Sequence, residues 1–365
     1  EIQEATDQQQ EHMRLIAENV QLSDTARAIT HRARERTALR LAINEEIERL
    51  RLASTTALLS RKDVIIVASV SCIYGLGSPE EFGRGTVTLR VGEIYRRNAL
   101  IRQLVESQYS RNDLDLRPGT FRVRGDTLEI IPAYEDKRGY RITFFGDEVE
   151  RIMKFVPLTG EVLSEPDEVS IYPAKHYLTE GEKLKKSISD IEKELEERLA
   201  LFKQEGKFLE AQRLEQRTRY DLEMLKEVGY CSGIENYSRY LTGRAPGEPP
   251  PTLFEFIPDN AIVFADESHV SVPQIGGMYR GDYRRKFTLA EHGFRLPSCM
   301  DNRPLKFEEW DAMRPQSVFV SATPGAWELE RTGGVLTEQF IRRTGLVDPQ
   351  GGKRWVEKPG EEDVE

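Results

Sequence analysis

A short apolar run followed by two acids decides how the chain is interpreted: residues Ala261 to His269 read Ala-Ile-Val-Phe-Ala-Asp-Glu-Ser-His. The five mostly apolar residues, bounded by a turn signal at Pro258-Asp259-Asn260, predict a strand that is buried on both faces. Asp266 and Glu267 then stand at the carboxyl end of this strand, where open α/β sheets bind their ligands. An acid in that place can hold a Mg²⁺ bridged to nucleotide phosphates, and its neighbour can orient a water for attack on the γ-phosphate.

A second apolar run, Ser317 to Val320, predicts another short strand, which ends in Ser321-Ala322-Thr323-Pro324-Gly325. If both strands belong to one sheet, their polar ends can face one site. An acidic pair alone is also explained by a solvated strand end that caps the next helix. A strand followed by Asp-Glu-Ser-His and a later strand followed by Ser-Ala-Thr, however, resemble motifs II and III of superfamily 2 helicase-like ATPases. The candidate catalytic residues are Asp266, Glu267, His269, Ser321 and Thr323, with Asp266 as the candidate metal ligand.

The composition is that of an acidic, folded chain. Its 365 residues leave room for two or three domains, and 38% hydrophobic residues can build real cores. The net charge of −10 argues against indiscriminate nucleic-acid binding, although 52 Lys and Arg leave room for a local basic groove. No apolar run approaches the roughly 18 residues of a membrane span, and no signal peptide opens the sequence. Cys72, Cys231 and Cys299 have neither disulfide-framework nor metal-ligand spacing, which predicts a cytoplasmic protein.

The first part of the chain is helical in pattern and then strand-like. Residues 1–41 are expected to form a polar helical arm or a poorly ordered terminus. Apolar residues at helical spacing predict a helix from Ala42 to about Ser60. Val64 to Val70 is fully apolar and predicts a further strand of the same parallel sheet. The glycines Gly75 and Gly77 that follow are better explained by a plain loop than by a phosphate-binding turn, because a third spaced glycine is missing.

The sequence between about Leu89 and Leu178 alternates like an antiparallel sheet. Leu100 to Gln108 predicts a short helix, and the segments 120–131 and 141–152 each carry a turn between alternating residues, which predicts two hairpins. The alternation places Phe121 and Val123 on one face and Arg122 and Arg124 on the other. These arginines are either ordinary solubilising charge or a patch for an acidic partner.

Helical spacing takes over after residue 179. Apolar residues follow one face from Leu184 to Phe202, Gly206 interrupts the pattern, and Phe208 to Val228 resumes it. We therefore expect an antiparallel helical hairpin. Its many charges are interpreted mainly as a solvated face.

Two stretches mix aromatic and basic residues. Tyr230 to Tyr240 could stack on or grip a nucleic-acid strand, or could pack a domain boundary. Met278 to Lys286 is the most basic stretch of the chain, and it either contacts a phosphate backbone or is a surface loop with fortuitous charge. The candidate DNA-binding residues are Tyr237, Arg239, Arg280, Arg284, Arg285 and Lys286.

Several longer stretches resemble the UvrABC system protein B family of bacterial nucleotide excision repair. The resemblance runs from Ala42 to about Asp348, more than three quarters of the chain. It rests on VASVSCIYGLG at 67–77, GTFRVRG at 119–125, GYCSGIENYSR at 229–239, DESHV at 266–270, QIGGMYRGD at 274–282, DNRPL at 301–305 and SATPG at 321–325.

This resemblance implies an α/β fold: a P-loop NTPase motor domain of the superfamily 2 helicase-like class, interrupted by a β-rich domain and a helical domain. Asp266 and Glu267 match the family's Mg²⁺-binding and water-activating acids, and Arg122 and Arg124 match arginines that dock UvrABC system protein A. Members are loaded onto damaged DNA by that protein, probe one strand with a β-hairpin and recruit the nuclease, UvrABC system protein C. The implied cofactors are ATP and Mg²⁺, the implied partners are damaged DNA and UvrABC system proteins A and C, and no membrane is expected.

The chain departs from the family pattern in three ways. A Walker A loop, Gly-x-x-x-x-Gly-Lys-Ser/Thr, occurs nowhere in the sequence. Residues 1–41 do not resemble the Tyr-rich hairpin that precedes the Ala42 helix in the family. The second motor domain and the contact with UvrABC system protein C are expected after Asp348 and are missing. These departures predict a fragment, or an aberrant or truncated member, with little or no ATPase activity of its own.

The expected domains follow from these patterns: a helical arm of unknown role (1–41), the first part of the motor domain (42–88), a β-rich domain that docks UvrABC system protein A (89–178), a helical domain (179–258), the second part of the motor domain (259–348) and a disordered tail (349–365). One alternative is a non-catalytic binding module that docks UvrABC system protein A or a transcription-coupled repair partner. Another is a different superfamily 2 translocase whose Walker A loop lies on another chain.

Overall fold

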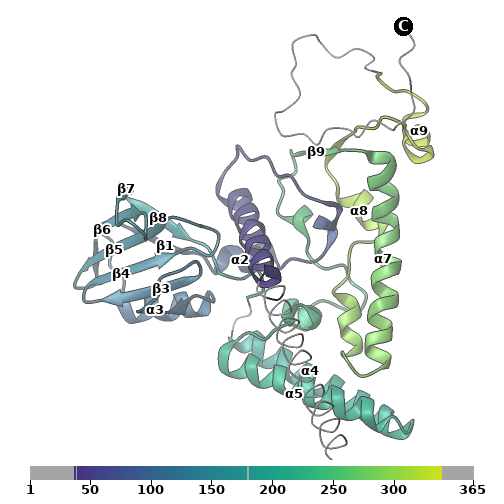
Figure 1. Ribbon diagram of the computed structural model, residues 1–365, viewed down its shortest axis with the longest axis horizontal. Coiled ribbons are helices and arrows are strands. Elements are labelled where there is room, and N and C mark those ends of the chain that lie inside the picture. The colour runs from purple at the N-terminus through teal and green to yellow at the C-terminus, as the bar shows by residue number, and fades with distance from the viewer. Residues whose placement is uncertain (1–36, 38, 179–180, 339–365) are drawn as a thin grey trace, which may run out of the picture.

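The computed structural model describes residue 37, residues 39–178 and residues 181–338, which form a β-rich part, a helical part and a mixed α/β part (Figure 1). The expectations for residues 1–36 and 38 and for the tail at 349–365 lie outside the described residues. In Figure 1 the β-rich part lies on one side, the helical hairpin lies below, and the α/β part with its long helix α7 lies on the other side.

Residues 39–60 are helical, which confirms the predicted helix from Ala42 to Ser60. One face of the second half of this helix is buried: Leu52 is 4% exposed and packs with Leu76, Phe82 and Phe256. The apolar residues of the first half are exposed, with Ile43, Ile47 and Leu50 at 49%, 48% and 50%. The helix is followed by η1 (Val70–Ile73) and by α2 (Pro79–Arg84), whose first turn is capped by the side chain of Ser78.

The predicted strand from Val64 to Val70 is wrong. The segment between the helix and η1 forms no strand, and Ile65 and Val67 are 92% and 96% exposed. An apolar segment becomes a central strand only when strands flank it and helices cover its faces. Among the described residues, the parallel sheet consists of two other strands, β9 and β10.

The β-rich part is a six-stranded sheet in the order β2-β3-β4-β5-β6-β7, with a separate antiparallel pair β1-β8. The two predicted hairpins are the antiparallel pairs β3-β4 and β5-β6. The helix predicted at 100–108 is α3. The bounds are β1 Val87–Arg90, α3 Arg97–Glu106, β2 Ser110–Arg111, β3 Thr120–Arg124, β4 Thr127–Ile131, β5 Gly139–Phe145, β6 Glu148–Phe155, β7 Val162–Ser164 and β8 Glu168–Ile171.

The predicted alternation in β3 is confirmed, since Phe121 and Val123 are 0% and 8% exposed whereas Arg122 and Arg124 lie on the other face. The buried face of the sheet packs against Leu100 and Leu104 of α3. Apolar burial of this kind contributes roughly 25 cal/mol per Å² of buried surface, so this core stabilises the β-rich part.

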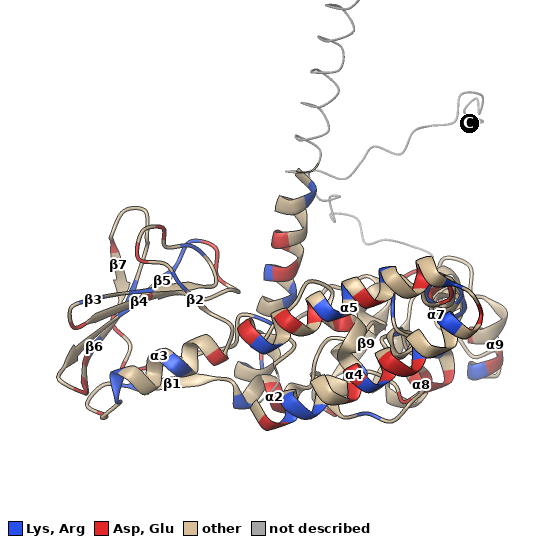
Figure 2. Cartoon of the chain, turned by 90° about the horizontal axis from the view of Figure 1, so that it is seen from below, with Lys and Arg blue, Asp and Glu red and all other residues tan. Residues whose placement is uncertain are grey.

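The helical part is the expected hairpin of α4 (Gly181–Gln204) and α5 (Phe208–Val228), with Gly206 in the turn between them. The apolar face from Ile188 to Phe202 is buried against α5 and against η2 (Ile234–Tyr237) and α6 (Ser238–Thr242). Figure 2 shows acidic and basic residues mixed along the outside of α4 and α5, as a solvated face requires.

The α/β part contains the two motif-bearing strands, β9 (Ile262–Ala265) and β10 (Gln316–Phe319), which pair in parallel. Its helices are η3 Leu253–Glu255, α7 Ser268–Glu291, η4 Pro297–Asp301, α8 Phe307–Met313 and α9 Ala326–Thr332. Its core joins Ile73 of η1 to Val272 and Ile275 of α7 and to Trp310 of α8.

The expectation that the first of these strands is buried on both faces is wrong. Ile262 and Phe264 of β9 are 53% and 68% exposed, and Val318 of β10 is 42% exposed. These side chains share one face of a two-stranded sheet, because Phe264 is paired with Val318 in the register. The opposite face carries Phe319, which packs into the core with Trp327. No helix in the described part of the chain is both long enough and apolar enough to cross a membrane.

Candidate nucleotide site and nucleic-acid interface

The ends of β9 and β10 lie side by side. In the parallel register Ala265 is paired with Phe319, so both strands end at the same edge of the sheet. Two backbone hydrogen bonds continue the pairing: Val320 N–H donates to the Ala265 carbonyl at 2.9 Å, and Ser268 N–H donates to the Val320 carbonyl at 2.9 Å. The acids after β9 and the hydroxyl residues after β10 therefore lie at one edge of the sheet, as the sequence predicted.

Side chains join the two segments as well. Nδ1 of His269 lies 2.8 Å from Oγ of Ser321 and 3.4 Å from Oε2 of Glu267. Oγ of Ser321 also accepts the backbone N–H of Thr323 at 3.1 Å. The imidazole thus links the acid at the end of β9 to the turn that follows β10.

The turn between β9 and α7 holds both carboxylates outward. Glu267 has φ 44° and ψ 52°, the left-handed region that non-glycine residues seldom occupy and that is often retained at functional sites. The Oδ1 of Asp266 accepts Glu267 N–H at 3.0 Å, and Ser271 Oγ donates to the Asp266 carbonyl at 2.7 Å. Both carboxylates are exposed to solvent, so they are available to a ligand.

A Mg²⁺ ion is commonly held by one or two carboxylates, with substrate phosphates and waters completing its shell. Asp266 fits such a site: one of its oxygens is fixed by the Glu267 amide, and its exposed carboxylate can face a metal. Within the described residues there is no group of three or more His, Cys, Asp or Glu that could hold a metal by itself.

The loop after Val70 packs beside the same helix that begins at the acids. Ile73 of η1 is fully buried against Val272 and Ile275 of α7. The need for glycine at position 77 comes from packing, because a Cβ there would lie 2.2 Å from the carbonyl oxygen of His176. This contact explains Gly77 as a point where two backbones approach closely.

Two of the candidate DNA-binding residues are committed to internal contacts. Tyr237 is 4% exposed, and its hydroxyl donates to Asp221 at 2.9 Å, so its ring is part of the helical core. Arg239 donates to Asp301 at 2.6 Å, and its side chain is 15% exposed. The stacking role expected for Tyr237 and the gripping role expected for Arg239 are therefore corrected to structural roles, because neither side chain is available to a nucleic acid.

The basic stretch at 279–286 lies in helix α7, and its residues differ in exposure. Lys286 is 5% exposed, with its ammonium 2.8 Å from Asp282 and donating to the Asn302 carbonyl. Its expected contact with DNA is corrected for this reason. The side chain of Arg285 pairs with Asp282 at 2.8 Å and is 65% exposed. Arg280 and Arg284 are exposed and form no ion pair with another described residue.

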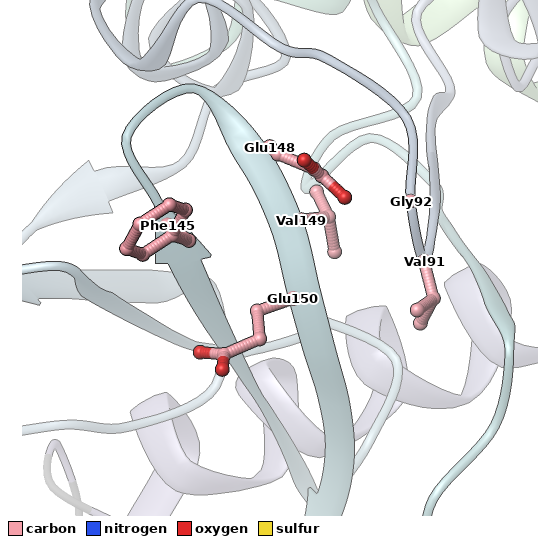
Figure 3. Close-up of a pocket in the computed structure, with 6 residues that line it drawn as sticks. All are labelled: Val91, Gly92, Phe145, Glu148, Val149 and Glu150. Carbon is pink, nitrogen blue, oxygen red and sulfur yellow. The ribbon is translucent and has the colours of Figure 1, made fainter.

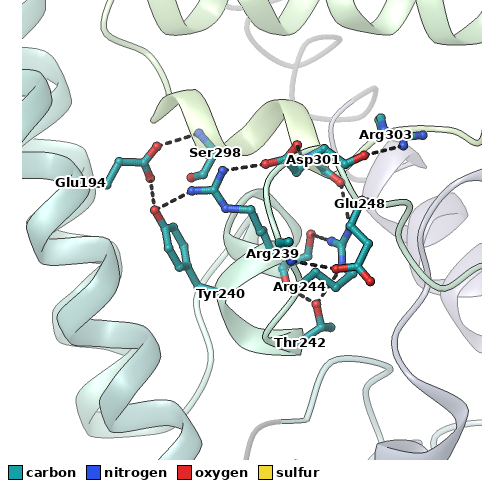
Figure 4. A network of polar contacts seen from close by, with 12 residues as sticks. Glu194, Arg239, Tyr240, Thr242, Arg244, Glu248, Ser298, Asp301 and Arg303 are labelled. Atoms are coloured by element: carbon teal, nitrogen blue, oxygen red, sulfur yellow. Dashed lines mark hydrogen bonds and ion pairs between the residues drawn. The ribbon is translucent and has the colours of Figure 1, made fainter.

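A polar network that the sequence analysis did not foresee joins the helical part to the α/β part (Figure 4). Asp301 accepts from Arg239 and, at 2.9 Å, from the backbone N–H of Gly247. Glu194 of α4 accepts from Tyr240 at 3.0 Å and from Ser298 N–H at 2.8 Å. Two partial signals are present in the sequence: the motif DNRPL at 301–305, and the stretch Tyr230 to Tyr240, for which packing of a domain boundary is one of the two predicted roles. The contacts of Arg239 and Tyr240 agree with that second role.

Comparison with known proteins adds to this geometry. Residues 87–177 match the family model described as the UvrB interaction domain, and residues 182–243 match the UvrB third helical domain. The chain is 60% identical over 307 residues to UvrABC system protein B of Geobacillus kaustophilus, which is 84% of this chain and 46% of that protein. It is 59% identical over 309 residues to that of Thermobifida fusca (85% and 44%) and 57% identical over 308 residues to that of Bacillus subtilis (84% and 46%).

The chain is a partial member of the UvrABC system protein B family. It spans about half the length of the curated relatives that it matches.

Within the matched UvrB interaction domain, Arg122 is held by a buried acid. Arg122 and Arg141 both donate to Glu129, which is 6% exposed, and the distance from Arg141 is 2.8 Å. Burial raises the pKa of Glu129, but the hydrogen bonds from the two arginines outweigh burial, so the pKa is lowered. Arg124 is exposed and donates to the Asp113 carbonyl at 3.0 Å.

The same UvrB interaction domain has a shallow hollow of about 240 Å³ beside β6 (Figure 3). It is lined by Val91, Gly92, Phe145, Glu148, Val149 and Glu150. Phe145 is 79% exposed, and no basic side chain lines the hollow. The domain therefore presents an acidic and apolar hollow as well as a face that carries arginines.

Proposed function

We propose that this chain is part of a protein that verifies DNA damage in bacterial nucleotide excision repair. The observation that carries the proposal is the contact between His269 and Ser321, which joins a strand-DESH motif to a strand-SAT motif at one sheet edge. The identity of 57–60% to proteins named UvrABC system protein B supports the same function. We place the protein in the cytoplasm, in keeping with three free cysteines.

In this proposal the motor domain has the P-loop fold of superfamily 2 helicases, and its cofactors are ATP and Mg²⁺. Asp266 would hold the metal, and Glu267 would orient the attacking water, because both carboxylates project from the sheet edge into solvent. His269 and Ser321 hold the two motifs together, and Thr323 is fixed through its amide. Bound Mg²⁺ would neutralise charge that develops on the phosphates.

These 365 residues by themselves are expected to hydrolyse little or no ATP. The sequence contains no Walker A loop, so the backbone amides and lysine that cradle the β- and γ-phosphates are not supplied by it. The test is hydrolysis of radiolabelled ATP by this chain with and without damaged duplex DNA. Hydrolysis that the damaged duplex strongly stimulates would contradict the expectation.

The partner proposal is that the β-rich part docks UvrABC system protein A through Arg122 and Arg124. An arginine that shares a buried carboxylate is held in a fixed orientation, so it can present its remaining N–H groups to an acidic partner. Damaged DNA and UvrABC system protein C complete the proposed set of partners.

A capture experiment tests this docking. Arg122→Ala with Arg124→Ala should weaken capture of UvrABC system protein A at least tenfold, since a truncated interface charge costs about 2 kcal/mol or more. The matched control is Arg90→Ala with Arg151→Ala, because those arginines are also ion-paired on the same domain, to Glu168 and Glu165. Equal capture by the first variant and wild type would count against docking at this face.

A further inference from the structure

Helix α7 carries a ladder of three aromatic rings, two of which are exposed. Tyr279, Tyr283 and Phe287 are spaced by four residues, and the ring centroids of successive pairs are 6.2 Å apart. The planes of Tyr283 and Phe287 differ by 20°. Tyr283 is 44% exposed and Phe287 is 48% exposed, so the described parts of the chain leave these rings partly open to solvent.

Two arginines run along the helix beside the ladder. Arg280 and Arg284 each follow a ring by one position, and a spacing of four residues places them about 6 Å apart along the axis. Both are exposed, and neither pairs with an acid in the described residues. The one acid of this stretch, Asp282, is 5% exposed and is neutralised by Arg285 and Lys286. The outer surface of this part of α7 is therefore positive and aromatic.

We infer that this face of α7 is a stacking platform for single-stranded nucleic acid, with bases on Tyr283 and Phe287 and phosphates on Arg280 and Arg284. This inference rests on the proposed DNA-related function and adds a binding surface on α7 with its base-contacting residues. Aromatic rings bind the faces of unpaired bases whatever their sequence, and adjacent cations bind the backbone. Rings 6.2 Å apart suit bases that are drawn apart, since stacked bases in a duplex strand are about 3.4 Å apart.

The ends of the ladder agree with this assignment. Tyr279 lies deeper than the other two rings, with Arg303 and Lys306 each 5.3 Å from its ring centroid. It closes the platform on that side, where Lys306 adds positive charge and Arg303 is ion-paired to Glu309. α7 runs along one side of the molecule (Figure 1), and the exposure of Tyr283 and Phe287 leaves their rings accessible to a ligand.

The experiment measures binding of the 365-residue chain to a fluorescent 12-nucleotide oligo(dT) and to a duplex of the same length. Tyr283→Leu with Phe287→Leu keeps apolar, helix-forming side chains and removes only the π faces. We expect this variant to raise the Kd for oligo(dT) about tenfold and to change the Kd for the duplex less than about twofold. The matched control, Phe208→Leu with Tyr220→Leu on α5, removes two other exposed rings, which are 69% and 57% exposed. It should bind both probes as the wild type does.

A second variant separates charge from stacking. Arg280→Gln with Arg284→Gln should weaken the binding of both probes. It should also reduce the magnitude of the negative slope of log K against log salt for oligo(dT) by about 1.4, because each phosphate contact contributes about 0.7. Arg96→Gln with Arg102→Gln, at the start of α3 and within it, removes the same charge elsewhere and should leave the slope unchanged. The leucine variant should keep the wild-type slope.

The stacking platform would be overturned if Tyr283→Leu with Phe287→Leu bound oligo(dT) with wild-type affinity. It would also be overturned if the affinity of this variant for the duplex fell as much as its affinity for oligo(dT). Failure of the wild-type chain to bind oligo(dT) would overturn it too. Capture of UvrABC system protein A by the same preparations tests the proposed repair function separately, so the two failures can be told apart. Thermal melts of each variant confirm that the fold is intact.

Discussion

His269 and Ser321 are separated by 2.8 Å between Nδ1 and Oγ, although they belong to segments that follow different strands. A backbone hydrogen bond lies next to this side-chain contact, because the Val320 carbonyl accepts the N–H of Ser268. Two motifs far apart in the sequence therefore form one polar edge on the sheet. The loop after Val70 packs on the same helix, because Ile73 is buried against Val272 and Ile275 of α7.

Gly77 should not tolerate alanine. A Cβ at this position would lie 2.2 Å from the His176 carbonyl oxygen, a contact that requires the backbone to move. We expect Gly77→Ala to lower the free energy of unfolding by about 2–3 kcal/mol through overpacking. Gly83→Ala is the control, because it lies inside α2 with no atom within 4 Å of the added Cβ. It should be neutral or stabilising by about 0.5–1 kcal/mol. Urea denaturation gives the free energy of unfolding of both variants. Similar values for Gly77→Ala and Gly83→Ala would contradict the close backbone contact at Gly77.

His176 should make the fold sensitive to acid. The side chain is 6% exposed, its ring stacks on Phe82 at 5.5 Å, and Nε2 lies 3.1 Å from Thr55 Oγ1. Burial, followed by the nearby charges of Arg51 and Lys175, lowers the pKa of His176 to about 3. Above about pH 6.5 both the folded and unfolded states are neutral at this site. Below that pH the unfolded state gains a proton that the folded state does not, so stability falls.

Because of His176, the free energy of unfolding should fall by about 1.4 kcal/mol for each pH unit below about pH 6.5, until the pH approaches about 3. Free energies of unfolding measured at about pH 7 and about pH 5 should therefore differ by about 2 kcal/mol more in wild type than in His176→Gln. His292→Gln is the control, because His292 is exposed at the end of α7. An identical pH dependence in wild type and His176→Gln would show that burial does not hold this imidazole neutral.

The Arg239–Asp301 pair should be a main link between the helical part and the α/β part. Their side chains are 15% and 13% exposed. Burial lowers the pKa of Arg239, but the hydrogen bond to Asp301 outweighs it, and the pKa is raised. Asp301→Ala should cost about 3 kcal/mol, because it leaves a buried guanidinium without its partner. Glu192→Ala, which breaks the exposed pair with Lys226, should cost less than about 1 kcal/mol.

A double-mutant cycle checks that the cost belongs to the pair. Arg239→Met in the Asp301→Ala background should be nearly neutral, which gives a coupling energy of about 1–3 kcal/mol. Additive losses would mean that Arg239 and Asp301 act independently. Denaturation by urea gives the free energies for all four chains.

The sequence predicted the elements whose signal is local. Apolar residues at helical spacing placed the helix at 42–60 and the α4–α5 hairpin, and alternation around turns placed β3–β4 and β5–β6. The predictions that failed depended on distant neighbours. Whether Phe264 is buried depends on which elements cover its face of the sheet, and whether Tyr237 can stack depends on the position of Asp221.

The candidate site also has some features with a local sequence signal and others that depend on distant parts of the chain. The strand ends were placed correctly because parallel strands bring their carboxyl ends to one edge. The burial of Lys286 was partly visible in the sequence, since Asp282 lies four residues earlier on the same helix. Its second partner, the carbonyl of Asn302, was not visible, because the loop after α7 returns to the helix only in the fold. The Arg239–Asp301 contact was hidden for the same reason.

Binding of a divalent metal at the edge formed by Asp266 and Ser321 is tested with Mn²⁺ alone, because these 365 residues do not include the Walker A loop that would cradle ATP. The sequence has five histidines, so ring signals of ¹⁵N-histidine can be resolved by NMR. His269 lies 3.4 Å from Glu267, which makes it a reporter for a paramagnetic ion at this edge. We predict that Mn²⁺ broadens the His269 signal selectively, that the signals of His176 and His292 remain sharp, and that Asp266→Asn abolishes the broadening. An unchanged His269 signal, or equal broadening of all histidines, would contradict the account.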